Sequence, residues 1–150
     1  MSYFMRYVLM RDELSLSDLD TALHQIDPKF TIQIDQAAAD TGDLYYGEEV
    51  YGELSVNRAG DLVFSEDLDE LREVLEGIED PLKGQVLSAL DSARAMVALH
   101  VLQAGHDNAD ILDQLWDWLF DHFAGLLQVD DEGYYNRDTL VLPTTPEEDS

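Results

Sequence analysis

The sequence predicts an α+β fold, in which an antiparallel or mixed sheet of about four or five strands carries three or four helices packed around a buried central helix. The central helix is predicted over residues 85–103, because the segment from Ala95 to Leu102 is apolar on almost every side of a helix. Other segments are apolar on one face only, either at helical spacing or in alternation. These segments are expected to pack against the central helix, with the helices mainly on one face of the sheet.

The first third of the chain is predicted to fold as strand, helix and strand. Residues 3–10 are rich in aromatic and branched side chains, which favours a strand with little exposed except Arg6. Apolar residues then recur at helical spacing over 16–26, after Ser15, whose hydroxyl can cap the first amides of a helix. Residues 30–34 alternate between apolar and polar side chains, as in a half-buried strand.

The middle of the chain is predicted to contain a loop, a hairpin and a helix. Residues 36–47 include small, acidic and glycine residues, which are typical of a loop. Residues 50–57 and 61–64 flank an Asn-Arg-Ala-Gly turn, and this pattern indicates a β-hairpin because Asn and Gly tolerate positive φ. From Ser65 to Ile78 an apolar stripe at helical spacing predicts a helix whose other side is acidic.

The last third is predicted to hold a long helix and a short strand. Residues 110–127 have apolar side chains at helical spacing, and residues 130–133 form a predicted turn. Residues 139–142 are expected to form the final strand. A single globular domain is predicted over residues 1–142, followed by an acidic tail over 143–150 that is expected to be disordered.

The charge of the chain is its most unusual property. It has 33 Asp and Glu against 8 Lys and Arg, for a formal net charge of −25 at pH 7. Such a field repels nucleic acid phosphates and anionic membranes, and it attracts basic proteins and cations. Three interpretations remain open: a surface suited to a saline cytoplasm, an acidic face for a basic protein partner, and a cation site.

Composition and motifs narrow the possible functions further. The chain has no cysteine, which excludes disulfides, thiolate zinc sites and cysteine nucleophiles. Its first apolar segment is too short for a transmembrane helix and lacks the pattern of a signal peptide, so a cytoplasmic location is expected. The sequence has no glycine-rich phosphate loop, HExxH or GxSxG motif, which lowers the expectation of an enzyme without excluding it.

A row of acids is the first candidate surface for binding a partner. Asp113, Asp117 and Asp121 lie at i, i+4 and i+8 of the predicted helix. Like charges at this spacing cost only about 0.2–0.5 kcal/mol per pair, so a solvated face can carry them. Alternatively, the row meets Arg or Lys of a partner. Trp118 lies beside it and can anchor an interface or pack under a neighbouring loop.

Tyrosines in two acidic segments form the second candidate surface. They are Tyr45, Tyr46, Tyr51, Tyr134 and Tyr135. If the strands that carry them are neighbours, these side chains form an aromatic and acidic surface for a basic peptide or protein. Otherwise they are ordinary strand residues whose hydroxyls meet water.

Oxygen ligands suited to calcium or magnesium are concentrated near the end of the chain. They are Asp130, Asp131, Glu132, Asn136 and Asp138. Their spacing departs from the EF-hand pattern, because Tyr134 stands where a ligand is expected and the terminal Glu is missing. The alternative is an acidic turn that leads into a strand.

Two histidines are candidates for proton transfer or ligation. His122 follows Asp121, and it can pair with a carboxylate and serve as a general base. His100 lies in the predicted central helix, where a hydrogen-bonded core histidine is the simpler interpretation.

Two stretches of the chain carry a recognisable pattern. The first joins YGELSVN at 51–57, GDLVF at 60–64 and the acidic segment 66–75. The second joins LWDWL at 115–119, GLLQ at 125–128 and DEGYY at 131–135. Together they resemble a family of small bacterial proteins that has no assigned function. The resemblance implies a shared fold and a bacterial or archaeal cytoplasmic origin, and it implies no activity and no catalytic residues.

The sequence as a whole favours a non-enzymatic cytoplasmic protein whose acidic surface binds a basic protein partner, in the manner of a toxin-neutralising or regulatory module. One alternative is an enzyme or cation-binding protein that uses carboxylates and His122. The other is an acidity that reflects only a saline cytoplasm.

Overall fold

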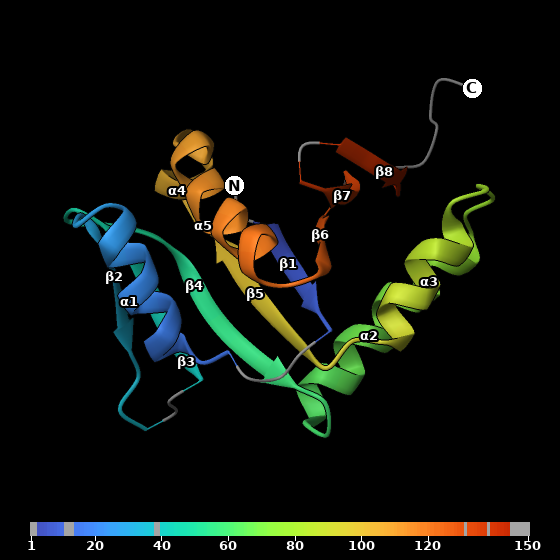
Figure 1. Ribbon diagram of the computed structural model, residues 1–150, viewed down its shortest axis with the longest axis horizontal. Helices are drawn as coiled ribbons and strands as arrows, with labels where there is room; N and C mark the ends of the chain where they lie inside the picture. Colours follow the sequence, from blue (N-terminus) through green and yellow to red (C-terminus); the bar gives the residue numbers. More distant parts are fainter. Residues whose placement is uncertain (1–2, 11–13, 38–39, 131, 138, 145–150) are drawn as a thin grey trace.

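The computed structural model describes residues 3–10, 14–37, 40–130, 132–137 and 139–144. Within these ranges it contains one sheet of eight strands and five helices (Figure 1). The strands are β1 (Tyr3–Leu9), β2 (Phe30–Ile34), β3 (Thr41–Tyr46), β4 (Glu49–Arg58), β5 (Ala95–Val101), β6 (Gly125–Val129), β7 (Gly133–Asn136) and β8 (Thr139–Pro143). The helices are α1 (Leu16–Ile26), α2 (Leu62–Glu76), α3 (Lys83–Asp91), α4 (Gln103–Asp107) and α5 (Ala109–His122). The strand order is β2-β3-β4-β5-β1-β6-β7-β8, and all neighbouring strands are antiparallel.

The centre of the fold is a strand, so the predicted central helix over 85–103 is wrong. Helix α3 ends at Asp91, and β5 begins four residues later, between β4 and β1. A strand that is hydrogen-bonded on both edges and covered on both faces needs apolar side chains in every direction, as a buried helix does. The spacing of apolar residues therefore cannot separate the two structures, whereas the β-branched Val97 and Val101 favour the strand.

The predicted sheet of four or five strands is also wrong. Strands β3, β5 and β6 lie in segments predicted as a loop or as helices, and β7 lies where no strand was predicted. Strand β6 falls within the predicted helix 110–127. Helix α5 ends at His122, and Phe123 has an extended backbone with φ −136° and ψ 133°. A Cβ atom at Gly125 would overlap the carbonyl oxygen of Val8, so glycine is required where β6 approaches β1.

The predicted hairpin around residues 57–60 is wrong as well. Strand β4 occupies the first predicted arm, but its hairpin partner is β3, across a turn in which Gly47 has φ 64°. The second predicted arm, 61–64, instead enters α2, which begins at Leu62. The helix was predicted to begin at Ser65, so it begins three residues earlier than expected. Phe64 is therefore part of α2, and its side chain is buried in the same core as the apolar stripe of this helix.

Several predicted elements are confirmed. Strands β1, β2 and β8 and helix α1 occupy the expected residues. Ser15 caps α1, because its Oγ accepts a hydrogen bond from the N–H of Asp18 at 3.1 Å. Most of the predicted acidic tail, residues 145–150, lies outside the described residues.

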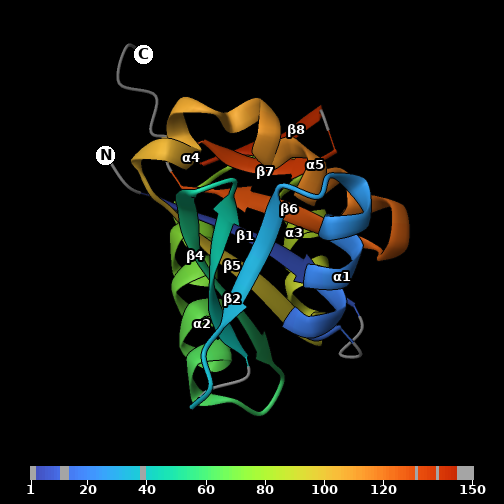
Figure 2. The same cartoon turned by 90° about the vertical axis from the view of Figure 1, so that its left-hand side faces the viewer.

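Helices cover both faces of the sheet, whereas the sequence predicted them mainly on one face. Helices α1, α4 and α5 lie on one side, and α2 and α3 lie on the other (Figures 1 and 2). We call these sides the α1/α5 face and the α2/α3 face. Successive residues of β1 alternate between them: Tyr7 and Leu9 belong to the core under α1 and α5, and Val8 belongs to the core under α2 and α3. Among the described residues, no helix is both long and apolar enough to cross a membrane.

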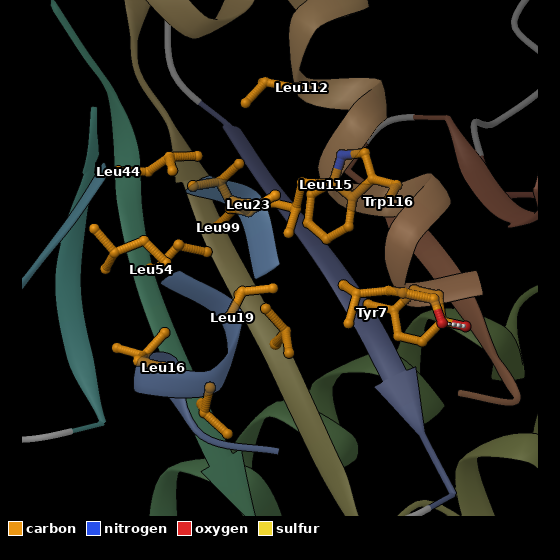
Figure 3. Packing of buried hydrophobic residues seen from close by; sticks show 14 of the residues in the cluster. Tyr7, Leu16, Leu19, Leu23, Leu44, Leu54, Leu99, Leu112, Leu115 and Trp116 are labelled. Atoms are coloured by element: carbon orange, nitrogen blue, oxygen red, sulfur yellow. Dashed lines mark hydrogen bonds between the residues drawn. The ribbon is translucent and has the colours of Figure 1, made fainter. Parts of the chain in front are cut away.

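The larger core lies on the α1/α5 face. Figure 3 shows how its side chains meet from α1, α5 and the strands, among them Leu16, Leu19, Leu23, Leu99, Leu115 and Trp116. The hydroxyl of Tyr7 donates to the carbonyl oxygens of Phe123, at 2.6 Å, and of Leu119, at 3.4 Å. The last carbonyls of a helix lack partners within the helix, so this contact fixes the end of α5 against β1.

Candidate functional site

The helices cover only part of the α2/α3 face. One row of side chains across this face is apolar, because Met96 of β5, Val8 of β1 and Leu126 of β6 are paired in register. These residues share a core with Leu71 of α2 and Val86 of α3. Two further rows, nearer the start of β1, are polar, and together they form the candidate site.

The two polar rows follow directly from the strand register. The first row consists of Asp43, Glu53, His100, Phe4 and Asp130. The second row consists of Thr41, Ser55, Ala98, Arg6, Gln128 and Tyr134. Because side chains alternate between the two faces of a strand, one or two polar residues per strand are enough to build rows that cross the sheet.

Beyond the helices, this face forms a groove of about 780 Å³, which we call the acidic groove. Three carboxylates line it, those of Asp35, Asp43 and Glu53, and Phe4 and His100 also line it. No Lys or Arg is present among the described residues that line it. A concave surface lined by one sign of charge focuses the electrostatic field, so the groove attracts cations in a chain of net charge −25.

A series of ring and charge contacts lies beside the acidic groove. Nδ1 of His100 lies 2.9 Å from Oε1 of Glu53, and the ionised carboxylate is the acceptor. The His100 ring stacks on Phe4 with 4.7 Å between ring centroids, and Cζ of Arg6 lies 4.9 Å from the Phe4 centroid. Phe4 is still 38% exposed, so these contacts place an apolar surface close to a carboxylate.

Arg6 is the cation of the second row. Its Nη1 donates to Oε1 of Gln128 and to Oδ1 of Asp130, both at 2.9 Å, and only 12% of its side chain is exposed. A charge at this depth is tolerated because it is paired and hydrogen-bonded.

Two buried donors beside this ion pair, Nε of Arg6 and the hydroxyl of Tyr134, have no hydrogen-bond partner among the described residues. Burial raises the pKa of Tyr134, so its hydroxyl keeps its proton and remains a donor. Arg6 and Tyr134 both line a hollow of about 180 Å³ under α2. This hollow can offer hydrogen bonds to a neutral acceptor, such as a peptide carbonyl or a water molecule.

Asp67 of α2 lies within the field of the same charges. Burial is the largest cause that raises its pKa, the carboxylates of Glu70, Glu66 and Asp130 raise it further, and Arg6 opposes them. The folded state therefore binds this proton more tightly than the unfolded state does. The stability that Asp67 contributes is greatest when it is protonated, and it falls as pH rises through the raised pKa.

Replacing Asp67 with asparagine is expected to raise the free energy of unfolding at pH 7, because the ionised carboxyl is destabilising there. The gain should disappear below about pH 4, near the pKa of an unfolded aspartate, where the wild-type side chain is protonated in both states. Urea unfolding between pH 3 and pH 7 measures it. Glu73→Gln, at an exposed position of the same helix, removes one charge as a control. An Asp67→Asn gain that does not vary with pH would contradict this account of Asp67.

The predicted acidic row on α5 is largely paired within the protein. Arg137 lies in the turn between β7 and β8. Its Nη1 is 3.7 Å from Oδ1 of Asp117, and its Nη2 is 2.5 Å from Oδ1 of Asp121. Its Cζ also lies 5.6 Å from the ring centroid of Phe120. Asp113 lies one turn nearer the start of the helix and lines a separate hollow. The repulsion expected within the row is therefore offset by a cation of the same chain.

The other residues predicted on this helix contact each other and the core. Trp118 is half-buried and packs against the larger core. The ring of His122 stacks on Trp118 with 4.4 Å between centroids. Nδ1 of His122 donates to the carbonyl oxygen of Trp118 at 2.9 Å. Within the described residues, His122 has no hydrogen bond to a carboxylate, which is the pairing that the general-base hypothesis requires.

The five predicted tyrosines do not form one surface. Tyr45, Tyr46 and Tyr51 lie on β3 and β4, whereas Tyr134 and Tyr135 lie on β7, beyond β5, β1 and β6. Tyr46 donates to Oδ2 of Asp27 at 2.6 Å and lies against Tyr51, with ring centroids 5.6 Å apart. Tyr51 is buried in the larger core.

The predicted calcium or magnesium ligands also have separate partners. Asp130 binds Arg6, and Glu132 accepts a hydrogen bond from the hydroxyl of Tyr135 at 2.6 Å. Asn136 is exposed at the end of β7, and Asp131 and Asp138 lie outside the described residues. In the described ranges, no three His, Asp or Glu side chains are grouped so that they could hold a metal ion.

The acidic groove was not predicted from the sequence. The two polar rows of this face had a signal in the sequence, a polar residue inside an otherwise apolar strand: Arg6 in β1, His100 in β5 and Gln128 in β6. Of these three, only His100 lines the acidic groove. Interpreting these residues as one site requires the strand order, because they are far apart in sequence. His100 in particular was assigned to a helix core, and it lies instead at the groove.

Comparison of the chain with protein-family models, with curated proteins and with solved structures found no match.

Proposed function

We propose that the protein binds a basic segment of a protein partner in the acidic groove. The observation that supports this most strongly is the groove itself. Its volume is about 780 Å³, and it is lined by the carboxylates of Asp35, Asp43 and Glu53 and by no Lys or Arg among the described residues. Electrostatic complementarity of this kind accelerates association and selects partners by charge. The exposed ring of Phe4 adds apolar contact for the methylene groups of Lys or Arg.

The sheet face is a better docking surface than the outer edge of β2. The N–H of Ile32 donates to Oδ1 of Asp20 at 2.9 Å, and Nδ1 of His24 donates to the carbonyl oxygen of Phe30 at 3.1 Å. Both side chains come from α1, and they occupy backbone groups that an added strand would need. This favours a partner that lies across the face of the sheet over one that extends the sheet at β2.

The proposed surface differs from the acidic row on α5 that the sequence indicated. Asp117 and Asp121 already bind Arg137, so a partner at that row would have to displace an internal cation. Among the residues that the structure describes, the carboxylate of Glu53 accepts a hydrogen bond from His100 alone and has no Lys or Arg partner. A regulatory or toxin-neutralising role in the cytoplasm is the form of this function that fits the cysteine-free, acidic composition.

Binding of a short fluorescent peptide that alternates lysine and serine tests this function. The double variant Asp43→Asn/Glu53→Gln is expected to raise the Kd of the peptide about tenfold, a loss of about 1.4 kcal/mol. Both substitutions keep the side-chain shape and remove only charge, so the groove should remain folded. The measurement is fluorescence anisotropy at about 0.15 M salt, where distant charges are largely screened.

A matched control removes the same charge elsewhere. Glu73→Gln/Glu76→Gln changes two exposed carboxylates of α2 that do not line the groove. This pair is expected to change the Kd by less than about twofold, because charges beyond a Debye length of about 8 Å are screened. An equal loss of affinity in both double variants would show that the peptide responds to net charge alone, and the groove would not be its site.

A further inference from the structure

A second hollow lies on the opposite face of the sheet, between α5 and the strands β1, β6 and β7. Its volume is about 290 Å³. Its inner wall is apolar and includes Met5, Leu112, Leu127 and Val129. The last three are at least nine-tenths buried members of the larger core, so the hollow reaches down to the core rather than lying on a charged surface.

The rim of this hollow is aromatic and acidic. Tyr3, Tyr135, Glu132 and Asp113 line it. The hydroxyl of Tyr135 donates to Oε1 of Glu132 at 2.6 Å, which holds this carboxylate at the rim. The same hydrogen bond is the largest cause that raises the pKa of Tyr135 to about 12. The pKa of Tyr3 is raised first by burial and then by the charge of Glu132. Both phenols therefore stay neutral beside a negative charge.

Arg137 also lines the hollow, but its charge is already neutralised. Its guanidinium group lies 2.5 Å from Asp121 and 3.7 Å from Asp117, on the side of α5. Two carboxylates therefore bind the one guanidinium, while Glu132 and Asp113 add negative charge at the rim. The balance of charge around the hollow is negative.

We propose that this hollow binds a small organic cation, an ammonium group carried on an apolar body. The apolar body would contact Leu127, Val129 and Met5, and the ammonium group would lie at Glu132 between the two phenol rings, which favour cations through their π faces. The volume is slightly below the range of about 300–1,000 Å³ typical of pockets for drug-sized ligands, so the ligand is small. This site is separate from the acidic groove, and it does not depend on the function proposed there.

Thermal unfolding with three probes at constant ionic strength tests this site. Hexylamine carries both the charge and the apolar body, 1-hexanol carries the apolar body alone, and methylamine carries the charge with almost no body. Hexylamine is expected to give a saturable rise in Tm of about 5–10 °C at a hundred times its Kd. The other two probes should give less than a third of this rise. Isothermal titration should give one hexylamine per chain.

Two variants decide whether the effect belongs to this hollow. Glu132→Gln changes one exposed residue, and it is expected to abolish the rise given by hexylamine. Glu53→Gln, in the acidic groove, is expected to leave the rise unchanged. Equal effects of hexylamine and hexanol would overturn the proposal, because the carboxylate would then play no part. Equal effects of hexylamine and methylamine, or a rise that survives Glu132→Gln, would overturn it too, since non-specific binding of a cation to an acidic chain would explain them.

Discussion

Replacing Leu99 with alanine is expected to lower the free energy of unfolding by about 2–5 kcal/mol, the cost of removing a buried leucine side chain and leaving a cavity. Leu99 is fully buried in β5, where it pairs with Leu54 of β4 and Met5 of β1. A Cβ atom at Gly52 would overlap the Leu99 side chain, so β4 and this leucine are closely packed. Urea or thermal unfolding measures the loss.

The expected loss is large compared with the total stability of a domain, which is about 5–15 kcal/mol. Leu62→Ala provides the control, because Leu62 is 74% exposed at the start of α2. Its cost should stay within about 0.5 kcal/mol. If the two substitutions had similar effects, Leu99 could not lie at the centre of the larger core.

Replacing Arg6 with methionine is expected to lower the free energy of unfolding by about 3 kcal/mol at pH 7, because the carboxylate of Asp130 would lose its cation. This value is at the low end for a broken buried pair, since the side chain of Asp130 is 35% exposed. Methionine keeps an unbranched apolar stem and removes the guanidinium group, together with its hydrogen bond to Gln128 and its contact with the Phe4 ring. The loss of stability should therefore come mainly from the carboxylate of Asp130, which would have no cation beside it. Asp67 adds to the loss, because Arg6 also favours its ionised form.

A second substitution separates charge from packing at this site. Adding Asp130→Asn to Arg6→Met is expected to restore part of the stability, because it removes the carboxylate that has lost its partner. Arg72→Met is the surface control: its side chain is 38% exposed and its partners Asp91 and Asp69 are more exposed still, so the cost should be within about 1 kcal/mol. If the double variant loses as much as the two single variants added together, Arg6 and Asp130 are not coupled.

Local signals were sufficient for the elements whose ends are marked by side-chain chemistry. Helix α1 was predicted within its observed bounds, because Ser15 caps it and its apolar residues repeat at helical spacing. Strand β2 was predicted from simple alternation, because one of its faces packs on the core and the other does not. In both segments the local preference and the tertiary environment agree.

The wrong predictions for β5 and β6 share one physical cause. The apolar segment 95–101 was predicted as helix because burial on all sides looks the same for a helix and for a central strand. Strand β6 was merged into α5 because Leu126 and Leu127 continue the helical spacing of apolar residues, although one belongs to each face of the sheet. In each case the partner strand decides the structure, and the partner is distant in sequence.

The sequence alone determined the charge of the protein, the absence of cysteine, the mixed use of helices and strands, and the polar residues that interrupt β1, β5 and β6. Only the tertiary structure decided what those residues do. The register of β4 with β5 places Glu53 beside His100, and that of β1 with β5 places Phe4 beside it, while helices α2 and α3 leave this end of the face uncovered. Cross-strand neighbours are set by hydrogen bonding between strands, which no single segment encodes, and so the acidic groove exists only in the folded sheet.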